Sequence, residues 1–540
     1  MKNAWIAWLA TIVFALVGLG LTADSAMRSS ATYDEVLYLK VGASWWRTGD
    51  QDAITRVGSP SLFWKLQQTI PLWCLDRAGH GAWIDEPERF QSHLLPIIRL
   101  GSLPIWLIAF ATTAAWARLL HGPNAMAFAS AVFGLSPNLL AHAPLVTMEM
   151  PLVACSAGIF LSFWLFLESG KSRYLCTCAI VAGIAFSCKY TVVLIPPILG
   201  VLWWLDLRTG FATIFSKLKQ LALGAIAFTA IMAATNLVVT GFSTLPISPN
   251  SGTHHSVEGR FAPFAARILE MPVPRELAGF AVQSRLQRQG GSSYLLGERR
   301  EHGWWWYYFV ALGVKATPAF LLMFAARIAM AFASPSSRKT AMMPQAIAIF
   351  LILTALGSTR NFGVRYLLLM SPVAIVWISG LAAGGRVWKF IAVAGVIGQA
   401  GAVATSHPHE LSYFPLWVNG HHGGRFILAD SNLDWGQGLK GLASLQNAHP
   451  HYRDLTLYYF GDTEPRFYGV SGTSFVINAG NHHPELPAEF RATTRYVGVS
   501  TSLSHGPWGP SGYFSVLDRV EPIHTLDDGT IAIYRVSDVQ

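Results

Sequence analysis

The run AWIAWLATIVFALVGLGL at residues 4–21 contains no charged residue, and the motif Thr32-Tyr33-Asp34-Glu35 follows it closely. A run of this length can cross the hydrocarbon core of a bilayer. Although Met1-Lys2-Asn3 and the run together resemble a signal peptide, we predict an anchor that is not cleaved. The two adjacent carboxylates would then stand at a membrane surface, where they could act as bases on a lipid-borne substrate. The structural alternative is a helix start, with Thr32 as the cap and both acids complementing the helix dipole.

The composition is that of a polytopic membrane protein. Of 540 residues, 52% are hydrophobic and 13% are charged, and the mean hydropathy is +0.38, whereas soluble domains carry about 25% charged residues. The net charge of +9 does not indicate nucleic acid, because most cations flank apolar runs, where they set orientation and meet anionic headgroups. The cysteines lack zinc or redox spacing and are expected to pack as small hydrophobic side chains; they are Cys74, Cys155, Cys176, Cys178 and Cys188.

About eleven membrane segments are predicted within residues 1–405, with long loops at 23–95 and 242–303. Several are shorter than the roughly 20 residues that a straight span needs, and the fifth and sixth are expected to form a tilted or partial hairpin bent at Lys189-Tyr190. The segments are Ala4–Leu21, Pro96–Ala117, Ala125–Leu140, Pro151–Leu167, Tyr174–Phe186, Thr191–Leu205, Leu221–Val239, Trp304–Ala326, Met343–Leu356, Tyr366–Leu381 and Val387–Ala404.

The basic residues predict the orientation. Every short loop on one side is basic, and its only acids are Glu168 and Asp206. Because cytoplasmic loops carry an excess of Lys and Arg, this side is predicted to face the cytoplasm. The long loops, Glu149 and everything after Ser406 would then lie outside the cytoplasmic (inner) membrane. The basic residues are Lys2, Arg118, Lys171, Arg173, Arg208, Lys217, Lys219, Arg327, Arg338, Lys339, Arg386 and Lys389.

Residues 406–540 are predicted to form an extracytoplasmic soluble α/β domain. Asp434-Trp435-Gly436-Gln437 is typical of a capping box, so we expect a helix from there to about Ala448. Asp430 and Asp434 could be catalytic, but caps and turns explain them better. Short strands are expected at Arg425–Asp430, Leu455–Phe460, Ser474–Asn478, Arg495–Val499 and Thr530–Val536.

Three groups of charged residues on the outer side could share one reaction. The first is Asp34-Glu35, and the second is Glu149, for which a helix start before Pro151 is the structural alternative. The third is a set of cations at the outer ends of spans: Arg99, Lys189, Lys315 and Arg365. Lys315 is the most unusual, because a charge that deep is costly and is functional by default; its alternative is snorkelling to the interface.

Acids and cations at one membrane face suit a transfer in which a lipid phosphate leaves. The carboxylate would remove a proton from the acceptor, and the cations would hold the phosphate as its negative charge returns. No P-loop or GxGxxG motif indicates a nucleotide. The DxD pattern Asp50-Gln51-Asp52 is a weak sign of metal, and the outward histidines lack the Cys/His spacing of zinc sites. We expect no cofactor, and a divalent metal is the less favoured alternative.

Several motifs resemble the polytopic GT-C glycosyltransferases that use polyprenyl-phosphate sugars, a family that includes the protein O-mannosyltransferases and the lipid A aminoarabinose transferase. They are Tyr33-Asp34-Glu35, Arg99-Leu100, Thr147-Met148-Glu149-Met150-Pro151-Leu152, Ala185-Phe186-Ser187-Cys188-Lys189-Tyr190 and Arg365-Tyr366-Leu367. Four further motifs look like a less characterised bacterial branch: Tyr294-Leu295-Leu296-Gly297-Glu298, Gly303-Trp304-Trp305, Lys315-Ala316-Thr317-Pro318 and Asp430-Ser431-Asn432-Leu433-Asp434-Trp435-Gly436-Gln437. Two departures are Glu149, where many relatives have Asp, and Lys189-Tyr190, which replaces a common Lys-Gly.

The resemblance implies an inverting glycosyltransferase with its active site outside the cytoplasm. Its donor would be a polyprenyl-phosphate monosaccharide, and its acceptor a hydroxyl of a protein, lipid or glycan. Asp34 is the expected base, and Glu35 and Glu149 would orient sugar or acceptor. The phosphate would lie among Arg99, Lys189, Lys315 and Arg365, and Tyr190 and Tyr366 complete the expected substrate-binding set.

Two other classes remain open from the sequence: a transporter or flippase of a lipid-linked sugar, and a non-catalytic glycolipid-binding assembly factor. A transporter would need polar residues near mid-membrane and matching halves. The predicted spans are otherwise nearly free of charge, and no internal repeat is visible. The bilayer is an expected partner, and nucleic acid is not.

Overall fold

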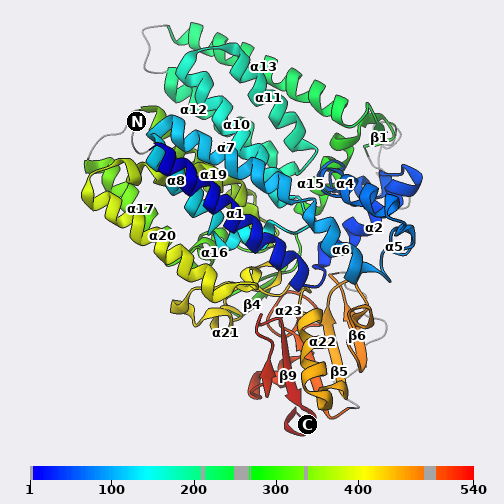
Figure 1. Cartoon of the computed structure of the whole chain (residues 1–540). Helices are drawn as coiled ribbons and strands as arrows, with labels where there is room; N and C mark the ends of the chain where they lie inside the picture. The colour runs from blue at the N-terminus through cyan, green and yellow to red at the C-terminus, as the bar shows by residue number, and fades with distance from the viewer. Residues whose placement is uncertain are drawn as a thin grey trace.

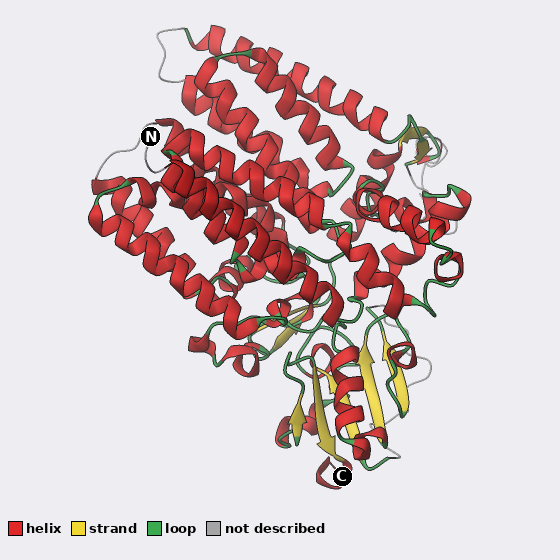
Figure 2. Ribbon diagram, viewed as in Figure 1, coloured by secondary structure: helices red, strands yellow, loops and turns green. Residues whose placement is uncertain are grey.

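The computed structural model describes residues 4–207, 213–247, 267, 269–333, 338–479 and 494–539. A large bundle of helices occupies most of the molecule, and a small sheet lies at one end beside the C-terminus (Figure 1 and Figure 2). The described residues do not include two of the basic residues that predict the orientation, Lys2 and Arg208. They also do not include the histidine pairs at 254–255 and 482–483, which were considered as zinc ligands.

In the described part of the chain, eight helices are long and apolar enough to cross a membrane, or up to nine if one bent pair counts as a single span. That pair is α16 (Tyr307–Lys315) and α17 (Pro318–Ala333), bent by 110°. The other helices of the bundle are α1 (Ala4–Arg28), α7 (Leu103–His121), α8 (Pro123–Gly134), α9 (Pro137–His142), α10 (Glu149–Ser169), α11 (Ser172–Phe186), α12 (Ile195–Leu207), α13 (Ile214–Val239), α18 (Arg338–Gly357), α19 (Ser371–Ile378) and α20 (Arg386–Ser406). The predicted multi-pass helical architecture is confirmed, while the number of eleven spans stays a prediction.

The long loop after α1 folds into short helices. They are α2 (Tyr33–Thr48), α3 (Asp52–Arg56), α4 (Phe63–Arg77), α5 (Gly81–Asp85) and α6 (Gln91–Leu100). The second long loop contributes β1 (Thr244–Pro246), β2 (Pro272–Pro274), α15 (Arg275–Gln289), β3 (Ser293–Leu295) and β4 (Glu298–Arg300). Both loops lie at the end of the bundle that carries the sheet (Figure 1).

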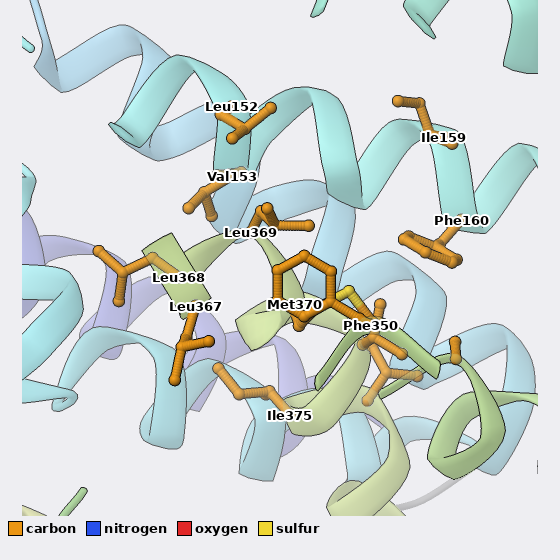
Figure 3. Close-up of a cluster of buried hydrophobic side chains, with 14 of the residues drawn as sticks. Leu152, Val153, Ile159, Phe160, Phe350, Leu367, Leu368, Leu369, Met370 and Ile375 are labelled. Carbon is orange, nitrogen blue, oxygen red and sulfur yellow. The ribbon is translucent and has the colours of Figure 1, made fainter. Parts of the chain in front are cut away.

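A buried apolar cluster fixes the segment that leads into α19. The 3₁₀ helices η1 (Tyr190–Leu194), η2 (Val364–Met370) and η3 (Ser379–Ala383) interrupt the bundle, and η2 packs against α10. Figure 3 shows the side chains of this cluster, among them Leu152, Val153, Phe350, Leu368 and Leu369. Fully buried side chains of this size anchor a backbone strongly. The first residues of η2 are therefore held at a defined place beside the start of α10.

The region after α20 contains short helical elements and a five-stranded sheet. The short elements are η4 (Glu410–Ser412), η5 (Leu416–Val418), α21 (Gly420–Gly424), η6 (Asp430–Asn432), α22 (Leu439–Ala448), η7 (Pro450–Arg453), η8 (Pro465–Tyr468), α23 (Thr501–Ser504), η9 (Ser515–Arg519) and α24 (Val536–Val539). The strands are β5 (Leu455–Phe460), β6 (Thr473–Ile477), β7 (Tyr496–Ser500), β8 (His524–Thr525) and β9 (Ile531–Arg535), in the order β6-β5-β7-β9-β8. β5 is parallel to β6 and β7, and β9 is antiparallel to β7 and β8.

Two local predictions in this region are wrong. Residues 425–430 form no strand, because turns that follow α21 lead directly into η6. The helix begins at Leu439, after the proposed capping box, because the Asp434 carboxylate accepts the N–H groups of Gly436 and Ser502 instead of those of a helix start. Asp434 thus ties its own turn to α23.

Candidate active site

Four predicted site residues from distant parts of the chain lie in one row of alternating charge. Asp34 Oδ2 is 2.8 Å from Arg365 Nη1, which is 3.8 Å from Glu149 Oε1. The same Glu149 oxygen accepts a hydrogen bond from Lys189 Nζ at 2.8 Å. We call these four residues the charged row.

The members of the charged row differ in exposure. The side chain of Asp34 is 26% exposed, that of Arg365 10%, and that of Glu149 1%. Burial raises the pKa of Asp34 above its usual value, and the adjacent Arg365 partly opposes this rise. Asp34 is therefore an accessible carboxylate with more than ordinary basicity. Glu149 Oε2 is buried and has no hydrogen-bond partner among the described residues, so it can accept a hydrogen bond from a bound molecule.

Two aromatic rings cover the cations of the row. Lys189 Nζ lies 4.4 Å from the centre of the Tyr366 ring, and the Arg365 guanidinium lies 4.3 Å from the Trp435 ring. Such contacts hold a cation in place without neutralising it. Trp435 belongs to a motif that is visible in the sequence. Nothing in the sequence places Trp435 beside Arg365, so sequence reasoning does not find it as a site residue.

The structure corrects the predicted roles of Glu35 and Arg99. Arg99 donates to both oxygens of Glu35, at 2.9 and 2.6 Å, and to the carbonyl oxygens of Ala26, Ser29 and Ser30. Both side chains of the pair are fully buried. The pair closes the junction of α1, α2 and α6, which leaves neither residue in contact with the charged row. Burial would raise the pKa of Glu35, but Arg99 and backbone N–H groups hold it below its usual value.

The surroundings of Lys315 also differ from those predicted for it. Its Nζ donates to three carbonyl oxygens, those of Leu411, Tyr413 and Asn432, at 2.9, 2.6 and 2.7 Å. An ammonium group has three donors, so none remains for a phosphate. Lys315 joins the end of α16 to the segment after α20, so we expect it to support the fold instead of binding phosphate.

The Tyr190 hydroxyl binds Glu276, which is not a member of the charged row. This hydroxyl donates to Glu276 Oε2 at 2.7 Å, and the other oxygen of Glu276 accepts from the backbone and hydroxyl of Ser61. Burial is the main reason that the pKa of Glu276 is raised. The contact fixes α15 on η1, next to Lys189, and Tyr190 also lines the apolar cavity described below.

An apolar cavity of about 340 Å³ ends beside the charged row. Tyr366 lines it and also contacts Lys189. The other lining residues come mainly from η1, α15 and α18, and they include Tyr190, Val193, Leu194, Phe280, Tyr308, Phe350, Leu353 and Arg360. A more polar cavity of about 940 Å³ separates α1 from α22 and reaches Thr32.

The arrangement offers side-chain cations but no metal site within the described ranges. No group of three or more His, Cys, Asp or Glu residues there is placed to hold a metal ion. In the DxD pattern, Asp50 accepts the N–H of Asp52, and Asp52 pairs with Arg275 at 2.6 Å. Independence of metal stays a prediction.

Comparisons with known proteins concern the family and the fold. Residues 92–235, which include Glu149 and Lys189, match the family model described as dolichyl-phosphate-mannose-protein mannosyltransferase. No curated protein matches the sequence. Among solved structures, ArnT from Cupriavidus metallidurans bound to undecaprenyl phosphate is similar with a TM-score of 0.50 and 13% identity over 99% of this chain and 98% of that one.

Two further solved structures are similar at lower scores. Apo ArnT from the same organism has a TM-score of 0.47 and 14% identity over 98% of each chain. The oligosaccharyltransferase of Archaeoglobus fulgidus, solved with zinc and sulfate, has a TM-score of 0.43 and 12% identity over 97% of this chain and 73% of that one. The match to the family model and the fold shared with the first ArnT structure confirm the predicted GT-C fold and indicate a multi-pass membrane glycosyltransferase.

Proposed function

We propose that this protein transfers a monosaccharide from a polyprenyl phosphate to an acceptor hydroxyl, with inversion, on the extracytoplasmic face of the cytoplasmic membrane. The observation that carries the proposal is the charged row at the end of an apolar cavity. The family match and the undecaprenyl phosphate bound to ArnT support a lipid-phosphate donor.

In this proposal the polyprenyl chain lies in the apolar cavity and its phosphate meets Lys189 and Arg365. Apolar side chains suit a hydrocarbon chain, and Tyr366 connects the cavity to Lys189. The two cations are paired with Glu149 and Asp34 before the donor arrives. A bound phosphate would compete for their N–H donors and leave both carboxylates freer to accept other hydrogen bonds.

The reaction follows from these positions. Asp34 removes the proton from the acceptor hydroxyl, and the acceptor oxygen forms a bond with the anomeric carbon. The bond between that carbon and the phosphate oxygen breaks, so polyprenyl phosphate leaves with the electron pair. Lys189 and Arg365 stabilise the charge that develops on the phosphate, and Glu149 orients the sugar through its unpartnered oxygen. The acceptor is a protein, lipid or glycan.

Asp34→Asn is the direct test. Asn keeps the shape and can still cap or start a helix, so folding should persist. If Asp34 is the base, transfer should fall by roughly 100-fold or more while donor binding stays close to that of the unaltered protein. The measurement is sugar transfer by purified enzyme from a polyprenyl-phosphate monosaccharide, alongside equilibrium binding of that donor.

Asp50→Asn is the matched control, because Asp50 is an exposed carboxylate of the same loop that lies in the DxD pattern. It should transfer normally, and a chelator should change neither variant. Full turnover by Asp34→Asn would remove Asp34 as the base. Donor translocation without transfer would favour the transporter alternative, and donor binding without either would favour the assembly factor.

A further inference from the structure

We propose that the C-terminal domain positions the Asp34–Arg365 pair for catalysis through Trp508 and Phe460, which complete a run of aromatic rings between the two partners. This proposal rests on the proposed function, because it concerns the residues named there as base and phosphate ligand. It assigns a role in the reaction to residues of that domain that do not contact the charged row.

The run contains four near-parallel rings. Tyr33, which precedes Asp34, stacks on Phe460 of β5 with ring centres 5.4 Å apart. Phe460 stacks on Trp508 at 5.7 Å with an interplanar angle of 3°, and Trp508 stacks on Phe362 at 6.3 Å. Phe362 is tied to Arg365, because its carbonyl oxygen accepts Arg365 Nε at 3.1 Å. The run therefore begins beside Asp34 and ends at a residue that holds Arg365.

The segment 430–437 binds both ends of the same run. Trp508 Nε1 donates to Asp430 Oδ1 at 2.9 Å. Asn432 Oδ1 accepts the N–H of Val364 at 2.9 Å, and the Trp435 carbonyl accepts the N–H of Tyr33 at 2.7 Å. The ring of Trp435 also faces the Arg365 guanidinium. One C-terminal segment thus contacts the backbone on each side of the ion pair.

The fit between this segment and η2 is close. Gly363 has a φ of +98°, and a Cβ atom there would lie 2.6 Å from Ser431 Oγ. Asp430 also has a positive φ, of 55°, which is uncommon for a residue with a side chain. A strained conformation is maintained only where the surroundings demand it. Two contacts hold this conformation of Asp430: the hydrogen bond from Trp508 to its side chain, and the Ser502 hydroxyl, which accepts its N–H.

The aromatic run helps to set the distance between Asp34 and Arg365 in this proposal. Because α2 and η2 are far apart in the chain, the 2.8 Å contact depends on elements that bridge them. Phe460 and Trp508 form the ring bridge, so we class them as positioning residues. Displacement of a reacting group by about 1 Å can cost 100-fold in rate, so a change at Trp508 should reach the reaction without touching substrate.

Trp508→Ala, Trp508→Phe and Tyr452→Ala test this positioning. Trp508→Ala should lower kcat by roughly 10- to 100-fold with a smaller change in donor KM. Trp508→Phe keeps a ring in the run and should recover most of the loss. Tyr452→Ala is the control, since Tyr452 belongs to another aromatic cluster of the same domain, with Tyr496 and His451. It should leave kcat unchanged.

The pH profile separates positioning from a general loss of structure. Asp34 is influenced by Arg365, Glu149 and Asp430, and among these only Arg365 lowers its pKa. If Trp508→Ala lets Arg365 move away, the pKa of Asp34 should rise, and the acid limb of kcat/KM should move to higher pH. Partial unfolding would lower the amount of active enzyme without moving this limb.

The possible outcomes distinguish the two proposals. A folded Trp508→Ala variant with unaltered kcat and acid limb overturns the positioning role, as does an equal loss in Tyr452→Ala. If Asp34→Asn abolishes transfer in the same assays, the proposed base survives either result. If Asp34→Asn transfers normally, Asp34 is not the base, and the positioning role that depends on it fails as well, although the transfer activity itself stands.

Discussion

Adjacent acids on α2 have different surroundings, and these decide what each can do. Asp34 is partly exposed and pairs with Arg365, whereas Glu35 is fully buried with Arg99. An exposed carboxylate can reach an acceptor hydroxyl. A carboxylate that is buried and saturated with hydrogen bonds stabilises the junction of three helices instead.

Glu35→Gln should destabilise the protein strongly. Removal of one partner from a buried ion pair leaves the other charge uncompensated and typically costs about 3–5 kcal/mol. Asp34→Asn should cost much less, because that pair retains access to solvent. Thermal unfolding of the two variants in detergent provides the measurement. A Glu35→Gln variant with unaltered unfolding but weakened donor binding would return Glu35 to the substrate site.

The Glu35–Arg99 pair also makes the stability of the folded protein depend on pH. The pKa of Glu35 is lowered in the folded protein, so its contribution to stability is present above the unfolded pKa of about 4.3. It is lost as the pH falls through the lower folded value, because the unfolded state then takes up protons first. Glu35→Gln should remove this part of the acid sensitivity.

The bend between α16 and α17 carries a buried lysine that contacts the C-terminal domain. Lys315 ends α16, and its ammonium group binds carbonyl oxygens in or beside η4 and η6. These contacts fasten the membrane bundle to the C-terminal domain near the segment that carries Trp435. The bend is therefore part of the link between the two regions.

Lys315→Met should lower stability while leaving donor affinity unchanged. Each buried acceptor that loses its partner costs about 1–3 kcal/mol, and three carbonyl groups lose the same donor. Lys389→Met is the control, because Lys389 is an exposed lysine of α20. Melting temperature and donor binding should be measured on both. Weaker donor binding by a fully stable Lys315→Met variant would restore the phosphate-binding role.

In the whole molecule, the helices α2–α6 and the C-terminal sheet lie at one end of the bundle (Figure 1). The turn between α10 and α11 belongs to the basic loops predicted to face the cytoplasm. Cys74 is exposed on α4, so it is a natural reporter for the opposite side.

Labelling with an impermeant thiol reagent tests the orientation. In spheroplasts, Cys74 of the unaltered protein should react. In a Cys74→Ser background, Ser511→Cys in the C-terminal domain should also react, whereas Ser172→Cys should react only after the membrane is permeabilised. Both serines are exposed, so burial would not explain a negative result. The reverse pattern would place the charged row on the cytoplasmic side.

The class of protein and most of its elements can be predicted from the amino-acid sequence. Long uncharged runs predict membrane helices because each residue contributes its own transfer free energy. The predicted apolar segments lie mainly on helices, and β5 covers the residues expected for it. Asp34, Glu149, Lys189 and Arg365 were also named in advance, since charges at the ends of apolar runs are conspicuous, and the structure brings them together.

Which charged residues share a site depends on how the chain folds, and the sequence does not show it. Arg99 and Lys315 look like Arg365 and Lys189 in sequence, yet their donors are occupied by Glu35 and by backbone carbonyl groups. Neighbouring residues of a helix point about 100° apart because one turn takes 3.6 residues. Asp34 and Glu35 therefore meet different partners, and those partners come from elements that only folding brings beside α2.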